Sequence, residues 1–227
     1  MRTPTLRVER ALFREGATRV AGVDEVGRGA LGGPVSVGVV VIDADCRTAP
    51  TGVRDSKLLA PSAREALVAP IQKWARDYAV GSATAVEIDT FGLTASLRLA
   101  GWRALAALRH FPDVVLLDGN LDWLSVRPEA LSLFDDGLPL PDVDAPHPSV
   151  RTQIKADMTC SSVAAASVLA KVQRDAFVSS LEAELPGYGW HVHKGYCTPE
   201  HQEAVRLLGL TDQHRRSWRI AALEADA

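Results

Sequence analysis

The segment RVAGVDEVGRGALGGPVSVGVVVI, residues 19–42, carries the strongest structural signal in the sequence. Valine-rich stretches stand at both of its ends, and a glycine-rich run with two carboxylates stands between them. β-Branched residues favour strands, whereas glycines next to a proline favour turns. We therefore predict two consecutive strands joined as a hairpin, with Asp24 and Glu25 at the end of the first strand.

The glycines of this segment also fit a different site. Gly27, Gly29 and Gly32 have the spacing G-x-G-x-x-G of a dinucleotide-binding turn. Such a turn needs a helix that begins within the glycine run, so that the helix N-terminus faces the pyrophosphate. Here Pro34 follows at once and a strand pattern follows the proline. A dinucleotide-dependent oxidoreductase remains a rival interpretation, which a fluorescence change or thermal shift with NAD(H) would support.

Beyond the hairpin, helical and strand patterns alternate. Helices are predicted over residues 59–79, with a kink or break at Pro70, over 93–111, over 160–185, and from Thr198 to Gly209. Strands are predicted over residues 78–85, 113–119 and 150–157. This order predicts an α/β fold with a mixed sheet flanked by helices and followed by a helical tail.

The composition is typical of one globular domain. The chain has 227 residues, of which 47% are hydrophobic and 23% are charged. We predict a single domain over residues 1–227, with a core over about 18–185 and a C-terminal helical extension over about 186–227. Three scattered cysteines form no C-x-x-C pair, and no signal peptide or membrane-spanning run is seen. These features predict a cytoplasmic protein that contacts no membrane.

The net charge of −3 is unevenly distributed. Residues 121–150 hold six acidic residues and a single arginine, Arg127, so the remainder of the chain is slightly basic. The proline-rich part of that stretch, residues 127–150, is predicted to be a loop. Basic residues become frequent toward the C-terminus, which permits a modest basic surface for nucleic acid.

Two further carboxylates stand at the ends of predicted core elements. Asp118 ends a buried strand, and Asp157 precedes the long helix. Taken singly, Asp118 fits a turn residue and Asp157 fits a helix N-cap. Neighbouring strand ends lie close together, however, so these side chains are expected to converge with Asp24 and Glu25. Oxygen-only ligand sets favour Mg²⁺ or Mn²⁺, and two such ions about 4 Å apart serve phosphoryl chemistry.

Five stretches in order resemble one known family, ribonuclease HII, the type 2 ribonuclease H. They are VAGVDEVGRGALGGPV, DSKLL, LLDGN, KADMTCSSVAAASVLAKVQRD and HKGYCTPEH, and they cover most of the chain. The resemblance implies a ribonuclease H-like fold with a mixed five-stranded sheet. It also implies cleavage of RNA in RNA–DNA hybrids, including 5′ to a single ribonucleotide in duplex DNA, leaving 3′-hydroxyl and 5′-phosphate ends.

The resemblance also implies roles for particular residues. The metal-binding carboxylates would be Asp24, Glu25, Asp118 and Asp157, with Mn²⁺ or Mg²⁺ as the cofactor. The backbone of Gly27, Arg28 and Gly29 would contact the ribose 2′-hydroxyl and the adjoining phosphates, and Tyr196 would stack on the following deoxyribose. Because Lys57 and Lys194 lie in matching stretches, they are candidate phosphate contacts, although either one also fits a solvated surface charge.

Some residues depart from the family pattern. His193 and Cys197 stand where asparagine and a small residue are usual, and MTCSS follows Asp157. The C-terminal sequence lacks the glutamine-plus-aromatics motif by which some relatives bind a sliding clamp, so no clamp partner is expected, and we expect a monomer. A non-catalytic module that binds hybrids remains the second rival interpretation; it would show no metal-dependent cleavage.

Overall fold

A computed structural model describes residues 3–125 and 138–218 of the chain. Its strands are β1 (Arg19–Val26), β2 (Val35–Asp43), β3 (Asp77–Ala83), β4 (Val114–Asp118) and β5 (Ser149–Gln153). Its helices are α1 (Arg7–Arg14), η1 (Ser56–Leu58), α2 (Pro61–Trp74), α3 (Ala85–Phe91), α4 (Leu93–Ala106), α6 (Ala156–Thr159), α7 (Ser161–Glu184), α8 (Trp190–His193) and α9 (Pro199–Leu208). The acidic stretch at residues 126–137 and the C-terminal residues 219–227 lie outside the described residues.

The sheet is mixed, as the sequence predicts. Its five strands have the order β3-β2-β1-β4-β5. The predicted hairpin is present, because β1 pairs antiparallel with β2, whereas β4 pairs parallel with β1 and with β5. The strand β2 begins directly after the glycine run, so no helix N-terminus faces that run as a dinucleotide site requires. This topology removes the structural basis of the oxidoreductase interpretation.

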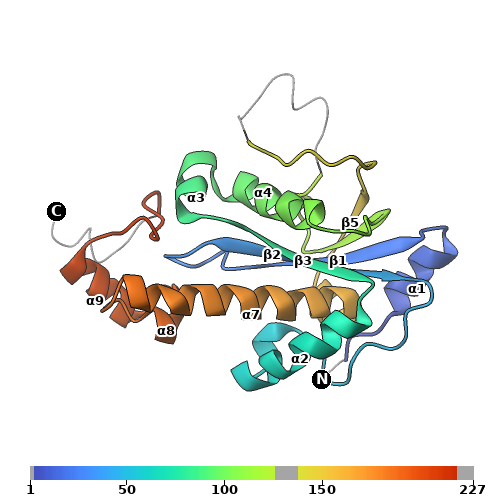
Figure 1. Cartoon of the computed structure of the whole chain (residues 1–227), viewed down its shortest axis with the longest axis horizontal. Coiled ribbons are helices and arrows are strands. Elements are labelled where there is room, and N and C mark those ends of the chain that lie inside the picture. Colours follow the sequence, from blue (N-terminus) through green and yellow to red (C-terminus); the bar gives the residue numbers. More distant parts are fainter. Residues whose placement is uncertain (1–2, 126–137, 219–227) are drawn as a thin grey trace.

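Helices cover both faces of the sheet (Figure 1). On one face, α3 and α4 pack on the side chains of alternate sheet residues, among them Val23, Val37 and Leu117. On the other face, α7 and α2 pack on Val40 and Ile42. At the far end of α7, α8 and α9 form the helical extension around a third apolar cluster that contains Trp190.

The long helix α7 lies directly on the sheet because two strand positions are glycine. A Cβ atom on Gly22 would come within 2.2 Å of the Ser162 carbonyl carbon, and one on Gly38 within 2.4 Å of the Ala166 oxygen. Residues 162 and 166 are one helical turn apart, so α7 contacts β1 and β2 with the same stripe. The small residues at the start of α7 therefore bring its N-terminal end close to the strand that carries Asp24.

Several predicted boundaries differ from the structure. The helix predicted over residues 59–79 ends at Trp74, and the strand predicted over 150–157 ends at Gln153. Pro70 does not divide α2. Proline has no N–H, so the carbonyl of Ala66 loses its helical hydrogen bond. Both residues are exposed, so water can take the place of the missing donor. The predicted helix over 93–111 ends at Ala106. The helix before it, α3, was missed although Thr84 and Glu87 form a capping box at its start. Within the described residues, no helix is long and apolar enough to cross a membrane.

Candidate active site

Asp24 and Asp118 lie at the ends of adjacent parallel strands. The pairing of β1 with β4 runs to Val23 opposite Leu117, so the next residue on each strand is one of the two aspartates. Strand neighbours are about 5 Å apart, and alternate side chains share a face. Both carboxylates therefore project on the side of the sheet that α7 covers. Asp24 is almost completely buried there, whereas Asp118 is partly accessible.

Asp118 also places the third aspartate. Its Oδ1 accepts a 2.6 Å hydrogen bond from the backbone N–H of Ala156, the first residue of α6. A carboxylate at this position satisfies an otherwise unpaired amide at the helix start and faces the positive end of the helix. The next residue is Asp157, whose side chain is buried. The hydrogen bond thus holds Asp157 beside the two strand ends.

Glu25 occupies the opposite side of the same strand end. It pairs with Val37, whose side chain lies in the core under α4, so Glu25 projects away from α7. One of its oxygens, Oε1, forms a 3.4 Å ion pair with Arg28, whereas Oε2 is buried without a protein partner. An unpaired buried carboxylate oxygen is costly unless a cation or a donor completes it.

The carboxylates repel one another across this edge. Burial raises the pKa of Asp24 well above its usual range, and the charges of Glu25, Asp118 and Asp157 raise it further. Burial, followed by the charges of Asp118 and Asp55, raises the pKa of Asp157 to about 6. The cluster therefore carries excess negative potential that a cation would relieve.

Lys57 is a second protein cation that acts on these groups, besides Arg28, which pairs with Glu25. It lies in η1, and its exposed side chain faces the cluster. Desolvation by itself would lower the pKa of Lys57, but the carboxylates of Asp24 and Asp55 outweigh it and raise that pKa. Lys57 and Arg28 are two cations beside four carboxylates, so the site retains a demand for further positive charge.

The donor set fits a hard divalent cation, since it consists of carboxylate oxygens alone. Within residues 3–125 and 138–218, no three histidine, cysteine, aspartate or glutamate side chains already stand as a complete cage for an ion. The residues that would hold one are Asp24, Glu25, Asp118 and Asp157. A bound cation would hold their oxygens near one another by offsetting their mutual repulsion.

The glycine loop after β1 is fixed from the buried side by two arginines. Arg215 donates to the carbonyl oxygens of Gly27 at 2.6 Å and Arg28 at 2.9 Å. Arg174, from α7, donates to the carbonyl oxygens of Pro34 at 2.8 Å and Gly32 at 3.1 Å. Both guanidinium groups are almost completely buried. The loop is thus held rigidly, and Arg28 and Gly29 remain exposed at its tip.

Tyr196 stands next to this loop. A backbone bridge joins it to Ala30, and its half-buried ring lies 5.2 Å from the Lys171 ammonium and 5.5 Å from the Arg174 guanidinium. The structure therefore brings together the carboxylates, the loop formed by residues 27–29, Lys57 and Tyr196 at one end of the sheet. These groups are part of the set that the resemblance implies, and their roles remain predictions.

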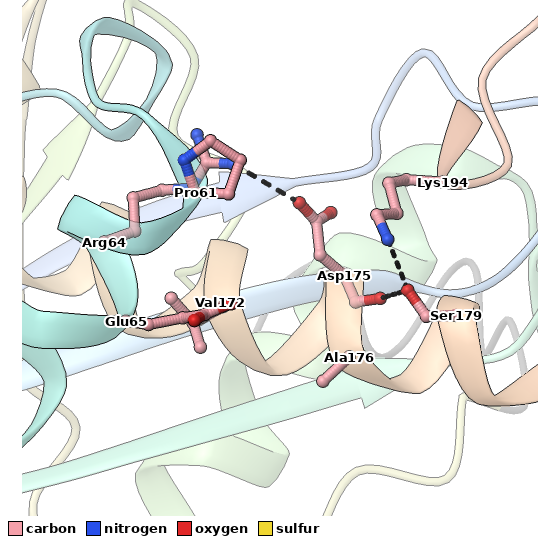
Figure 2. Close-up of a pocket in the computed structure, with 8 residues that line it drawn as sticks. All are labelled: Pro61, Arg64, Glu65, Val172, Asp175, Ala176, Ser179 and Lys194. Atoms are coloured by element: carbon pink, nitrogen blue, oxygen red, sulfur yellow. Dashed lines mark hydrogen bonds and ion pairs between the residues drawn. The ribbon is translucent and has the colours of Figure 1, made fainter. Parts of the chain in front are cut away.

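Lys194 has a different setting. It lines a pocket of about 150 Å³ between α2 and α7, opposite Arg64 and Asp175 (Figure 2). Its ammonium donates to the Ser179 hydroxyl and, at 2.8 Å, to the His191 carbonyl. A lysine ammonium has three N–H donors, so the predicted phosphate contact of Lys194 would use the third and leave these two hydrogen bonds in place.

Comparison with known proteins identifies the family of this chain. The family model described as Ribonuclease HII matches residues 21–221. The chain belongs to the ribonuclease HII family. It is 44% identical to a ribonuclease HII of Streptomyces avermitilis, covering 95% of this chain and 83% of that protein. It is 43% identical to a ribonuclease HII of Paracoccus denitrificans, covering 96% of this chain and 93% of that protein.

Solved structures agree with this assignment to the ribonuclease HII family. The ribonuclease H2 of Pyrococcus horikoshii is 32% identical, with a TM-score of 0.64 over 92% of this chain and 97% of that one. The structure of Bst-RNase HIII in complex with Mn²⁺ is 20% identical, with a TM-score of 0.65 over 95% of this chain and 72% of that one, and shows the shared fold. The predicted ribonuclease H-like sheet is therefore confirmed, and the chain is a ribonuclease H hydrolase.

Three histidines behind Tyr196 explain a departure from the ribonuclease HII pattern. His193 accepts from the Gly195 N–H at 3.0 Å through Nδ1, so its Nε2 donates to the Tyr188 carbonyl at 2.7 Å. Its ring stacks on that of His201 with centroids 3.9 Å apart. The side chain that replaces the usual asparagine thus supports the turn that carries Tyr196.

The other two histidines form a relay of fixed hydrogen-bond direction. The Thr211 N–H donates to Nδ1 of His214 at 3.0 Å, so Nε2 of His214 donates to Nε2 of His201 at 3.1 Å. Nδ1 of His201 then donates to the Tyr196 carbonyl at 2.9 Å. A neutral imidazole has one donor and one acceptor nitrogen, whereas a protonated imidazole has two donors. Every ring nitrogen of His201 and His214 therefore has a matching hydrogen-bond partner only while both rings are neutral. Burial lowers the pKa of His201 and that of His214 to about 4, consistent with this state.

We expect His201 and His214 to titrate near pH 4 in the metal-free protein. In the unfolded chain an ordinary histidine titrates near about 6.5, so between these pH values the unfolded state binds more protons. The stability that these imidazoles contribute is therefore complete above about pH 6.5 and falls as the pH drops toward about 4. Histidine ring resonances followed by NMR, assigned with His→Asn variants, measure the midpoints; midpoints near about 6.5 for this pair would contradict the relay.

Sequence patterns contain no sign of several residues that build this site. Arg174 lies in a stretch that resembles the family, and Arg215 lies in the basic C-terminal part, but arginines are expected at the surface.

The Thr198 N-cap and the Gly209 end of α9 were predicted and are confirmed. The predicted loop at residues 127–150 is described only from residue 138 onward.

Proposed function

We propose that this chain is a metal-dependent endoribonuclease that cleaves the RNA strand of RNA–DNA hybrids. We further propose that it cuts 5′ to a single ribonucleotide embedded in duplex DNA and leaves 3′-hydroxyl and 5′-phosphate ends. This activity would serve the removal of ribonucleotides from DNA. One observation carries the proposal: Asp24 and Asp118 end neighbouring strands on the α7 side of the sheet, and Asp118 holds the start of the helix that carries Asp157, beside an anchored glycine loop and a tyrosine.

Each group has a task in the proposed reaction. Asp24, Glu25, Asp118 and Asp157 would hold Mg²⁺ or Mn²⁺. Two such ions activate the attacking water and stabilise the leaving oxygen in phosphodiester cleavage. Burial raises the pKa of Asp24 and that of Asp157, and the charges of neighbouring carboxylates raise both further. A bound cation would stabilise the charged form of these groups, so the cluster favours cation binding.

The loop and Tyr196 would supply selectivity. The ribose 2′-hydroxyl is the group that distinguishes RNA from DNA at a given site. Glycine at position 29 lets the backbone approach that hydroxyl closely, and Arg28 offers an exposed guanidinium to the phosphates. The Tyr196 ring would stack on the following sugar, and the Lys57 ammonium would contact a phosphate near the carboxylates.

A DNA duplex that contains one ribonucleotide tests this proposal. With Mg²⁺ or Mn²⁺ we expect a single cut 5′ to the ribonucleotide; with EDTA we expect none. An all-DNA duplex of the same sequence is the matched control. Gel analysis of the end-labelled strand, with marker strands that carry each type of end, measures the position and chemistry of the cut. Binding without cleavage in either metal would favour the non-catalytic module instead.

A further inference from the structure

Asp175 joins two cations that belong to different parts of the site. It lies on α7, in the pocket between α2 and α7 (Figure 2). Its Oδ1 accepts from the Lys171 ammonium at 2.8 Å, and its Oδ2 lies 3.8 Å from the guanidinium of Arg64. All three side chains are 12–14% exposed. Ion pairs this sheltered are screened less than surface pairs, and removing one partner leaves charges uncompensated.

The first cation fixes the segment that carries Lys57. Nη1 of Arg64 donates to the carbonyl oxygens of Ser56 and Leu59, both at 2.9 Å. These residues flank Lys57 in and next to η1. The bonds made by Arg64 therefore set where the Lys57 ammonium stands relative to the carboxylates, and Asp175 holds Arg64 from behind.

The second cation lies against Tyr196. Lys171 is one helical turn before Asp175, and its ammonium is 5.2 Å from the centre of the tyrosine ring. A cation at this distance from an aromatic face is attracted to the ring. Asp175 fixes the position of that ammonium, and the ammonium in turn is one of the groups against which the Tyr196 ring packs.

We propose that Asp175 is a positioning residue that fixes the spacing between Lys57 and Tyr196, the phosphate and sugar contacts on either side of the carboxylates. The inference rests on the function proposed above. Asp175 itself contacts neither the substrate nor a metal. It acts through Arg64 on one contact and through Lys171 on the other, so its loss would let the scissile phosphate shift relative to the carboxylates.

Double-mutant cycles on the full-length protein test this role. Asp175→Asn keeps the size of the side chain and removes its charge. We expect it to lower kcat/KM on the single-ribonucleotide duplex by about tenfold or more. In a Lys57→Ala background the same change should lower kcat/KM by only about threefold to fourfold, and likewise in a Tyr196→Ala background, because only one of the two positioned contacts is then left to be displaced. Asp175→Glu should restore part of the lost rate.

A purely structural role predicts different results. The positioning role is overturned if Asp175→Asn lowers kcat/KM by the same factor in the Lys57→Ala or the Tyr196→Ala background as it does alone. It is also overturned if Asp175→Asn leaves kcat/KM unchanged. Circular dichroism at the assay temperature measures the folded fraction of each variant, and kcat/KM is corrected for it. If Asp175→Asn does not fold, Arg64→Gln replaces it in the double-mutant cycle with Lys57→Ala. The matched control is Glu15→Gln, which breaks the exposed ion pair with Arg151 and should keep full activity. Failure of the unmutated protein to cleave would refute the proposed function itself.

Discussion

Asp24→Asn is expected to reduce metal-dependent cleavage by about three orders of magnitude or more, which corresponds to about 4 kcal/mol of transition-state stabilisation. The reason is that Asp24 is buried and interacts with the charges of the other three carboxylates, so its charge would help to hold the proposed cation. Binding of the nucleic acid should be largely spared, because the loop at residues 27–29 and Tyr196 are unchanged. Single-turnover cleavage and a fluorescence-anisotropy titration measure the two effects.

The same variant should be more stable than the unmutated protein when metal is removed. A buried carboxyl whose pKa is raised is costly in its charged form at neutral pH, and asparagine removes that cost together with the repulsion. We expect the free energy of unfolding in EDTA to rise by about 1 kcal/mol. Glu15→Gln, in an exposed ion pair outside the cluster, is the control for loss of a carboxylate. An active, metal-responsive Asp24→Asn protein would remove Asp24 from its proposed role.

Alanine at Gly27 and at Gly29 should have opposite consequences within one loop. Gly27 has a φ of +83°, and a Cβ there would come within 2.1 Å of Nε of Arg174, which is held by hydrogen bonds to three carbonyls. We therefore expect Gly27→Ala to lower the free energy of unfolding by about 2 kcal/mol or more. Urea denaturation measures this change.

Gly29→Ala should leave stability within about 0.5 kcal/mol of the unmutated value. Nothing lies within 4 Å of the position that a Cβ on Gly29 would take, and its φ is not in the left-handed region. If the backbone at this glycine approaches the ribose 2′-hydroxyl, the added methyl will intrude there, and KM for the single-ribonucleotide duplex should rise about tenfold. An unchanged KM would show that the substrate does not approach this position, and an unchanged stability of Gly27→Ala would refute the collision with Arg174.

The confirmed predictions concern residues whose roles are set locally. The hairpin follows from valine-rich runs around a glycine turn, and the ends of α9 follow from Thr198 and Gly209, because strand propensity and helix capping act within a few residues. The mixed sheet and its flanking helices follow from the order of these patterns. A kink or break was predicted at Pro70, and the break is wrong because α2 runs through Pro70; the exposure of Ala66 and Pro70 that permits this depends on how the helix packs.

Of the candidate site, the chemistry could be read from the residues alone: carboxylates at the ends of core elements, a glycine loop beside them, and the stretches that place the chain in its family. The arrangement of these groups emerged only with the folded chain. Folding put Asp24 and Asp118 on the same side of the sheet and Glu25 on the other, let the Asp118 carboxylate start α6, and buried Arg174 and Arg215 behind the loop. The physical reason is that burying a charge is costly unless partners compensate it, and the partners of the two arginines are distant in sequence and become known only when the chain is folded.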